Sequence, residues 1–326
     1  MSKSVDAVPA DMVPDPELGG SSGIGLAMTK RFAHAGAFVT IADIATEQGT
    51  LAASDLTSQG CSVNFVRCDV KDFDSCVAAF NAALCFCPTG SLDVVALIAG
   101  VAGEPGSLVD QVIHGQAGTR SEGCQDKDPV RPAHSGIDVN LTAVYECTYL
   151  ALWYLSLKKD GKDKQGTEHS EEKIAGTSKT KEGTKSLILI SSTVAYTDVP
   201  LFSDYQTSKL GVRGLFRGLR HSTLELNVRL NTLAPYFVHT PLVTKCLPIL
   251  AEKGILEGKG ITFVNIDRVV DAAARLAVDE SLHGRSLAVV PGPHGVIDLK
   301  DDEDGMWAGE VVNDILKTRR AAGDLM

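Results

Sequence analysis

Short apolar runs alternate with stretches of helical period along most of this 326-residue chain. The runs lie at residues 38–42, 61–66, 92–98, 187–190, 228–233 and 287–290. Runs that are apolar on both faces are typical of parallel strands that helices cover on both sides. The repeated strand–helix units therefore predict an α/β fold built on a doubly wound parallel sheet in a single domain.

Helical patterns fill the intervals between these runs. Ile24, Met28 and Phe32 recur every four residues, and Gly36 stands where a helix C-cap is expected. Residues 138–157 and 267–279 are two further predicted helices.

Two insertions interrupt the alternation. Residues 104–136 are rich in glycine, proline and polar side chains without a sustained period, which predicts a surface loop. Residues 158–185 carry eight basic and six acidic side chains, which predicts a solvated, flexible loop.

Composition excludes several classes of protein. The net charge of −10 and the pI of about 5.3 argue against nucleic-acid binding and against docking on anionic lipid. Neither a run of about 18 apolar residues nor a secretory leader is visible, so a cytoplasmic location without a membrane span is predicted. The histidines and the eight cysteines lack zinc-site spacing, and no metal is predicted.

A glycine-rich segment opens the first predicted helix, with glycines at 19, 23 and 25. Such a loop lets a pyrophosphate approach backbone N–H groups at a helix N-terminus, although a plain loop gives the same pattern. Asp43 ends the next predicted strand, where a carboxylate accepts hydrogen bonds from an adenosine ribose. No Arg or Lys follows Asp43 directly, which favours NAD over NADP.

A second set of residues indicates proton transfer. Ser192 follows a predicted strand, Tyr205 comes 13 residues later, and Lys209 lies one helical turn beyond Tyr205. A phenol with a pKa of about 10 is a poor base near neutrality, but a neighbouring ammonium favours the phenolate. A Tyr-x-x-x-Lys pattern often arises by chance. Because Ser192 and the upstream glycine loop accompany it here, a functional set of residues is favoured over coincidence.

With these motifs the chain resembles the classical short-chain dehydrogenase/reductase family, which implies a Rossmann-type fold. The resemblance extends from about Gly19 to Gly292, and the fungal 15-hydroxyprostaglandin-dehydrogenase-like branch looks nearest. It implies Ser192, Tyr205, Lys209 and Asn140 as catalytic residues, with Asn140 supporting a proton relay. It implies contacts with the cofactor from Gly19, Ser22, Gly23, Ile24, Gly25, Asp43, Asp69, Val70, Ala99, Gly100, Tyr205, Lys209, Pro235 and Thr240.

Three positions depart from the family pattern. Residues 11–18, where the first strand is expected, contain two prolines and three acids, so that strand is predicted to be missing or irregular. Ile98 replaces an asparagine that ties neighbouring strands, and Tyr236 replaces a turn glycine. The predicted organisation is an irregular segment at 1–18, a Rossmann domain at 19–300 and a tail with a helix at 301–326.

These observations predict an oxidoreductase that interconverts a secondary alcohol and a ketone with Tyr205 as general acid/base. Residues 193–204 and 236–255 are expected to contact a small apolar substrate, and the resemblance implies a homodimer or homotetramer. Apolar side chains of the second segment are Phe237, Leu242, Val243, Leu247, Ile249 and Leu250. The alternative is a cofactor-impaired protein of the same fold that serves as a scaffold or a non-redox catalyst.

Overall fold

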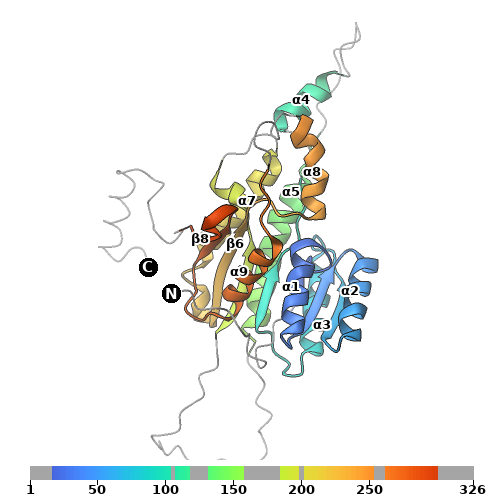
Figure 1. The fold of residues 1–326 in the computed structure, drawn as a ribbon, viewed down its shortest axis with the longest axis vertical. Helices are drawn as coiled ribbons and strands as arrows, with labels where there is room; N and C mark the ends of the chain where they lie inside the picture. The colour runs from blue at the N-terminus through green and yellow to red at the C-terminus, as the bar shows by residue number, and fades with distance from the viewer. Residues whose placement is uncertain are drawn as a thin grey trace, which may run out of the picture.

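The computed structural model describes residues 17–103, 107–117, 131–157, 184–197, 202–252 and 261–299. Eight strands in these ranges form one sheet in the order β3-β2-β1-β4-β5-β6-β7-β8. Neighbouring strands are parallel except for β8, which runs antiparallel to β7. The order reverses between β1 and β4, which confirms the predicted doubly wound α/β fold (Figure 1).

The strands follow the predicted apolar runs closely. Their bounds are β2 (Phe38–Asp43), β3 (Ser62–Arg67), β4 (Val94–Leu97), β5 (Lys185–Ile190), β6 (Val228–Pro235) and β7 (Ser286–Val289). The sequence pattern did not predict β8 (Val296–Asp298), whose three residues are all exposed at the edge of the sheet.

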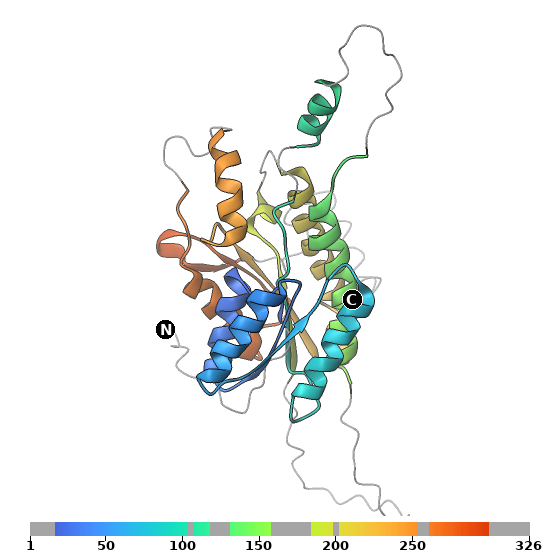
Figure 2. The same ribbon diagram turned by 90° about the vertical axis from the view of Figure 1, so that its right-hand side faces the viewer.

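Helices cover both faces of the sheet, as the two views show (Figures 1 and 2). On one face lie α1 (Gly23–His34), α2 (Thr46–Ser58) and α9 (Ile266–Val278), and their apolar residues form a core with β2 and β5. On the other face lie α3 (Phe73–Phe86), α6 (Val144–Leu155) and α7 (Ser203–Leu219), where Phe80, Leu150 and Phe216 are buried. The sheet is therefore covered on both sides, as its apolar strands require.

The first strand is irregular, as the prolines and acids upstream predict. β1 spans only Glu17–Leu18, and these two residues pair in parallel with Ile41 and Ala42 of β2 and with Ala96 and Leu97 of β4. The central position of the sheet is thus occupied at the end that leads into the glycine-rich segment. Residues 1–16 lie outside the described ranges.

The predicted loop at 104–136 is wrong in part, because α4 (Leu108–Ala117) lies within it and α5 (Ser135–Ile137) begins at its end. The backbone N–H of Ser107 and its hydroxyl both donate to Asp110, and the Asp110 N–H donates back to the Ser107 hydroxyl. This reciprocal cap starts α4 in spite of its polar surroundings. The helix predicted over 138–157 begins with the π-helical η1 (Asp138–Ala143) and continues as α6.

The remaining described elements are α8 (Pro241–Glu252) and three short 3₁₀ turns, η2 (Thr193–Tyr196), η3 (Thr223–Leu226) and η4 (Gly292–His294). Most of the charged insertion and the tail at 301–326 with its predicted helix lie outside the described residues, so the domain boundaries remain predictions. No described helix has the length and apolar character needed to cross a membrane.

Candidate active site

A cavity of about 580 Å³ lies at the carboxyl ends of the parallel strands, where the strand order reverses. This is the edge at which open α/β sheets bind their ligands. Every predicted cofactor residue lines the cavity, and so do Ser192, Tyr205 and Lys209. The fourth predicted catalytic residue, Asn140, lies just behind the wall.

The glycine-rich segment forms a tight turn between β1 and α1 that tolerates no side chain. Gly19 has a φ of +92°, and a Cβ there would lie 2.7 Å from the Ala99 backbone. A Cβ on Gly25 would lie 2.1 Å from the Gly19 carbonyl oxygen, and Gly23 also has a positive φ, of +52°. Glycine is therefore required at positions 19 and 25, and any other residue at position 23 would be strained.

The N-terminus of α1 is suited to bind an anion. Ser22 caps the helix by position, but its side chain makes no capping hydrogen bond, and the first turn carries no acidic residue. Ser22 and Ile24 both line the cavity. The first N–H groups of a helix need a partner, and a dinucleotide pyrophosphate supplies one, so these residues fit the cofactor that the sequence predicts.

The Asp43 carboxylate lies at the end of β2 on the cavity wall. One of its oxygens accepts hydrogen bonds from the backbone N–H and the hydroxyl of Ser21, and the other accepts one from the Ala45 N–H at 3.0 Å. These bonds fix the carboxylate in place beside the glycine turn. Asp69 and Val70 follow β3 and line the same end of the cavity, as Ala99 and Gly100 do after β4.

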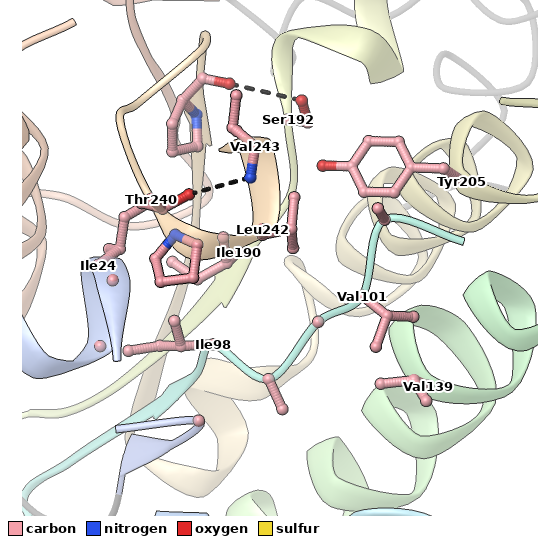
Figure 3. A pocket seen from close by; sticks show the side chains of 18 of the residues that line it. Ile24, Ile98, Val101, Val139, Ile190, Ser192, Tyr205, Thr240, Leu242 and Val243 are labelled. Carbon is pink, nitrogen blue, oxygen red and sulfur yellow. Dashed lines mark hydrogen bonds between the residues drawn. The ribbon is translucent and has the colours of Figure 1, made fainter. Parts of the chain in front are cut away.

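Ser192 and Tyr205 bring two hydroxyl groups together in the middle of the cavity (Figure 3). Ser192 follows β5, and Tyr205 lies in the first turn of α7. Burial raises the pKa of the Tyr205 phenol, while a hydrogen bond with the Ser192 side chain lowers it. Ser192 Oγ also lies 3.4 Å from the Pro235 carbonyl oxygen, to which it donates.

Lys209 lies one turn beyond Tyr205 on the same face of α7. Its Nζ lies 5.7 Å from the centre of the Tyr205 ring and donates to the Ile190 carbonyl oxygen at 3.0 Å. Lys209 is only 5% exposed, and burial lowers its pKa from 10.5 to about 8. The ammonium form thus still predominates at neutral pH.

Asn140 joins the helix η1 to the loop after β4. Its Oδ1 accepts from the Val101 N–H at 2.8 Å, and its Nδ2 donates to the Val101 carbonyl oxygen at 2.9 Å and towards Ser208 Oγ at 3.3 Å. The side chain is fully buried. Asn140 therefore holds the cavity wall and contacts the catalytic helix α7.

Pro235 ends β6, and Thr240 precedes α8. Thr240 is buried, and its methyl group would lie 3.2 Å from a Cβ on Gly23, which places it against the glycine turn. The Val243 N–H donates to Thr240 Oγ1 at 3.5 Å. Pro235 and Thr240 thus connect the Ser192 and Tyr205 hydroxyls with the end of the cavity formed by the glycine turn.

Beyond Tyr205 the cavity is apolar. Phe237, Leu242, Val243 and Leu250 line it as predicted, whereas Leu247 does not. Sequence reasoning missed Val101, Ala102, Ser135 and Val139 on the opposite wall, because their segments carry no motif and reach the site only through the fold. The side chain of Ile249 lies outside the description.

No group of three His, Cys, Asp or Glu side chains within the described ranges could hold a metal ion. Fold and side chains together define a Rossmann-type protein with the residue set of an alcohol dehydrogenase.

Comparison with known proteins gives the family. The short chain dehydrogenase family model matches residues 18–166 and 175–248. A 5′-hydroxyaverantin dehydrogenase of Dothistroma septosporum is 43% identical over 94% of this chain and 92% of that protein. A 5′-hydroxyaverantin dehydrogenase of Emericella nidulans is 39% identical with the same coverage, and an NADP-dependent dehydrogenase of Phoma sp. is 31% identical over 84% of this chain and 73% of its own length.

Solved structures agree on the fold. An actinorhodin polyketide ketoreductase with NADPH superposes with a TM-score of 0.64 at 19% identity, covering 87% of this chain and 97% of that one. The chain belongs to the short-chain dehydrogenases, and it is an oxidoreductase of the alcohol-dehydrogenase type. The predicted family is confirmed, and the relatives named above are fungal, in line with the expected branch.

Proposed function

We propose that this protein is an NAD-dependent dehydrogenase that interconverts a secondary alcohol and a ketone, with Tyr205 as general acid/base. The observation that carries the proposal is the arrangement around the buried Tyr205 hydroxyl. This hydroxyl lies beside the Ser192 side chain (Figure 3), and Tyr205 lies one helical turn from the Lys209 ammonium in the cavity that the glycine turn enters.

In the oxidation direction, Tyr205 takes the proton of the substrate hydroxyl, and Ser192 donates a hydrogen bond to the same oxygen. A bound nicotinamide supplies the hydride chemistry. Burial opposes formation of the phenolate, so a positive charge close to Tyr205 is required. Lys209 provides that charge and also contacts the cofactor, while Asn140 supports a proton relay behind it.

The substrate is proposed to be neutral, apolar and bulky. Among the described residues, the charged side chains that line the cavity are Asp43, Asp69 and Lys71 at the cofactor end and the catalytic Lys209. The described lining beyond Tyr205 carries no charged side chain, which disfavours anionic substrates. By their names, two relatives act on 5′-hydroxyaverantin. We extend that substrate, or an alcohol of similar size, to this chain.

Replacing Tyr205 by Phe tests the mechanism. Formation of NADH from 5′-hydroxyaverantin and from 1-(2-naphthyl)ethanol is expected to fall by about 10²–10⁴-fold, because the proton acceptor is removed. The Kd for NADH, measured by fluorescence, is expected to change by less than about threefold, because the ring remains. A Tyr205→Phe variant with full turnover would contradict the assignment of Tyr205 as general acid/base.

Replacing Asp43 by Ser tests the cofactor proposal. The carboxylate repels a 2′-phosphate, so the wild-type protein is expected to bind NADH more tightly than NADPH by about tenfold or more. The Asp43→Ser variant is expected to lose most of this preference, since the repelling charge is removed. Tighter binding of NADPH by the wild-type protein would overturn the choice of NAD, and the NADP-dependent relative makes this comparison necessary.

The prolines and acids at residues 11–18, where the first strand is expected, and Ile98 in place of asparagine favour the alternative of a cofactor-impaired protein, since that strand braces the glycine turn. Absence of NADH binding at millimolar concentration would support that alternative over the dehydrogenase.

We also propose that the chain forms a homo-oligomer through the outer face of α6. Tyr145, Tyr149 and Trp153 lie on successive turns of this helix and are each more than half exposed. Leu210 of the neighbouring α7 is 45% exposed. Large aromatic side chains in water favour a contact with a second copy.

A cytoplasmic location stays a prediction.

A further inference from the structure

The residue before Tyr205 is a buried carboxylate that the mechanism above does not use. Asp204 lies in the first turn of α7 and is 6% exposed. Its Oδ1 accepts a hydrogen bond from the Tyr205 N–H at 2.7 Å, and its Oδ2 accepts one from the Gly136 N–H at 3.0 Å. Each carboxylate oxygen therefore binds a backbone donor from a different part of the chain.

Two glycines leave space for this carboxylate. A Cβ on Gly103 would lie 2.4 Å from Asp204 Oδ1, and a Cβ on Gly136 would lie 2.7 Å from Oδ2. Real Cβ atoms essentially never lie within 3.0 Å of a non-bonded atom, so neither position accepts alanine while Asp204 stays in place. The carboxylate fits closely between two backbone segments.

The two segments that Asp204 contacts form the cavity wall facing the catalytic hydroxyls. Gly103 follows Val101 and Ala102, which line the cavity, and Gly136 lies between Ser135 and Val139, which line it as well. Asn140 already ties these segments together through Val101. Asp204 adds the connection from this wall to the catalytic helix, next to Tyr205.

We infer that Asp204 is a positioning residue that fixes Tyr205 relative to the substrate wall formed by residues 101–103 and 135–140. The inference rests on the proposed function. These contacts involve Tyr205, Gly136 and Gly103, and none of them involves the glycine turn or Asp43. The loss of Asp204 is therefore expected to change kcat and KM for the alcohol and to leave NADH binding largely intact.

The variant Asp204→Asn tests this role with little change of volume. An amide has one acceptor oxygen, so it can accept from the Tyr205 N–H or from the Gly136 N–H but not from both. We expect kcat for 1-(2-naphthyl)ethanol to fall by about 10–100-fold, because small misplacements of catalytic groups reduce rates strongly. The KM for the alcohol is expected to rise several-fold, while the Kd for NADH stays within twofold.

The variant Ser203→Ala is the control for a local disturbance of the α7 N-terminus. The Ser203 hydroxyl accepts from the Leu108 N–H and contacts neither segment of the wall. We expect its kcat and KM to remain within twofold of the wild-type values. If Asp204→Asn lowers only Tm and leaves kcat and KM of the folded enzyme unchanged, Asp204 is merely structural and the inference is wrong.

A double-mutant cycle probes the contact itself. Gly136→Ala is expected to lower kcat/KM by tenfold or more in the wild-type background but by much less in an Asp204→Ala background, where the two clashes with the carboxylate are gone and only the backbone carbon of residue 204, at 3.3 Å, remains close. Equal losses in both backgrounds would overturn the inference.

Amide hydrogen exchange gives a readout that needs no turnover. In Asp204→Asn we expect faster exchange in residues 134–141 and unchanged exchange in β5 and β6. If these changes occur in a protein that turns over no alcohol, the proposed function fails and the contact stands. Unchanged exchange in residues 134–141 would refute the contact whatever the activity.

Discussion

At the residue scale, the buried charge of Lys209 destabilises the folded protein, although the proposed mechanism requires that charge. Its ammonium is buried with one hydrogen bond, to the Ile190 carbonyl oxygen, and burial lowers its pKa to about 8. A group whose pKa falls on folding destabilises the folded state while it is charged. Natural sequences keep such residues where activity needs them.

The variant Lys209→Met is expected to be inactive but more stable at pH 7. The shift of the Lys209 pKa from 10.5 to about 8 corresponds to a destabilisation of the folded state by about 3 kcal/mol, which Met removes. Loss of the hydrogen bond to the Ile190 carbonyl oxygen costs about 1 kcal/mol, so the free energy of unfolding is expected to rise by about 2 kcal/mol. Between pH 8 and 10.5 the unfolded chain binds more protons at Lys209 than the folded chain. Wild-type stability from this group therefore rises with pH, and the advantage of Met shrinks.

Urea unfolding of both proteins at pH 7 and pH 10 checks this prediction, because the difference between them isolates Lys209 from other titrating groups. A difference in the free energy of unfolding that is the same at both pH values would contradict it.

Residue patterns also set the limit of what the sequence predicts about the site. Ser192, Tyr205 and Lys209 could be identified because their spacing follows from one strand end and one helical turn. Asp204 could not, because a carboxylate in the first turn of a helix is typical of ordinary capping. Its contact with Gly136 spans 68 residues, and only the fold brings the two together.

At the element scale, the long periodic segments were predictable and the short ones were not. The strands β2 to β7 and the helices α1 and α9 follow from apolar period alone. β1 has two residues and no period, and it keeps its place because β2 and β4 on either side offer unpaired backbone groups to it. α4 was missed because its cap, Ser107 with Asp110, stands in a region rich in glycine and proline.

Three elements meet at a cluster of thiols beside the part of the cavity wall that Asp69 and Val70 form. Cys76 of α3 has its sulfur 3.6 Å from that of Cys147 in α6 and 3.9 Å from that of Cys68, which follows β3. All three are buried. The contact with Cys147 and burial raise the pKa of Cys76 to about 12, and the contact with Cys76 and burial raise that of Cys68.

These thiols are therefore expected to resist alkylation, since the thiolate is the reactive form. With iodoacetamide at pH 8, the exposed Cys85 is expected to react within minutes, whereas Cys68, Cys76 and Cys147 react only when urea unfolds the protein. Mass spectrometry of the separate peptides measures each site. Labelling of Cys76 as fast as that of Cys85 in the native protein would contradict the burial of the cluster.

At the scale of the whole molecule, helices of the same chain cover both apolar faces of the sheet, whereas the outer face of α6 exposes large aromatic side chains. The ring centres of Tyr149 and Trp153 lie 6.5 Å apart, and both side chains are 57% exposed. Two copies with a net charge of −10 each repel one another at long range, so an apolar contact has to offset that repulsion. We propose that the α6 face provides such a contact.

The variant Trp153→Glu is expected to convert the oligomer to a monomer or to weaken it by at least 100-fold in Kd, because it places a charge in the centre of the contact. Light scattering coupled to size exclusion, at micromolar protein and two salt concentrations, measures the mass. Leu51→Glu is the matched control, because Leu51 is 63% exposed on α2, on the opposite face of the sheet, and should leave the mass unchanged. A wild-type chain that is monomeric under these conditions, or a Trp153→Glu variant that keeps the wild-type mass, would show that α6 is not the interface.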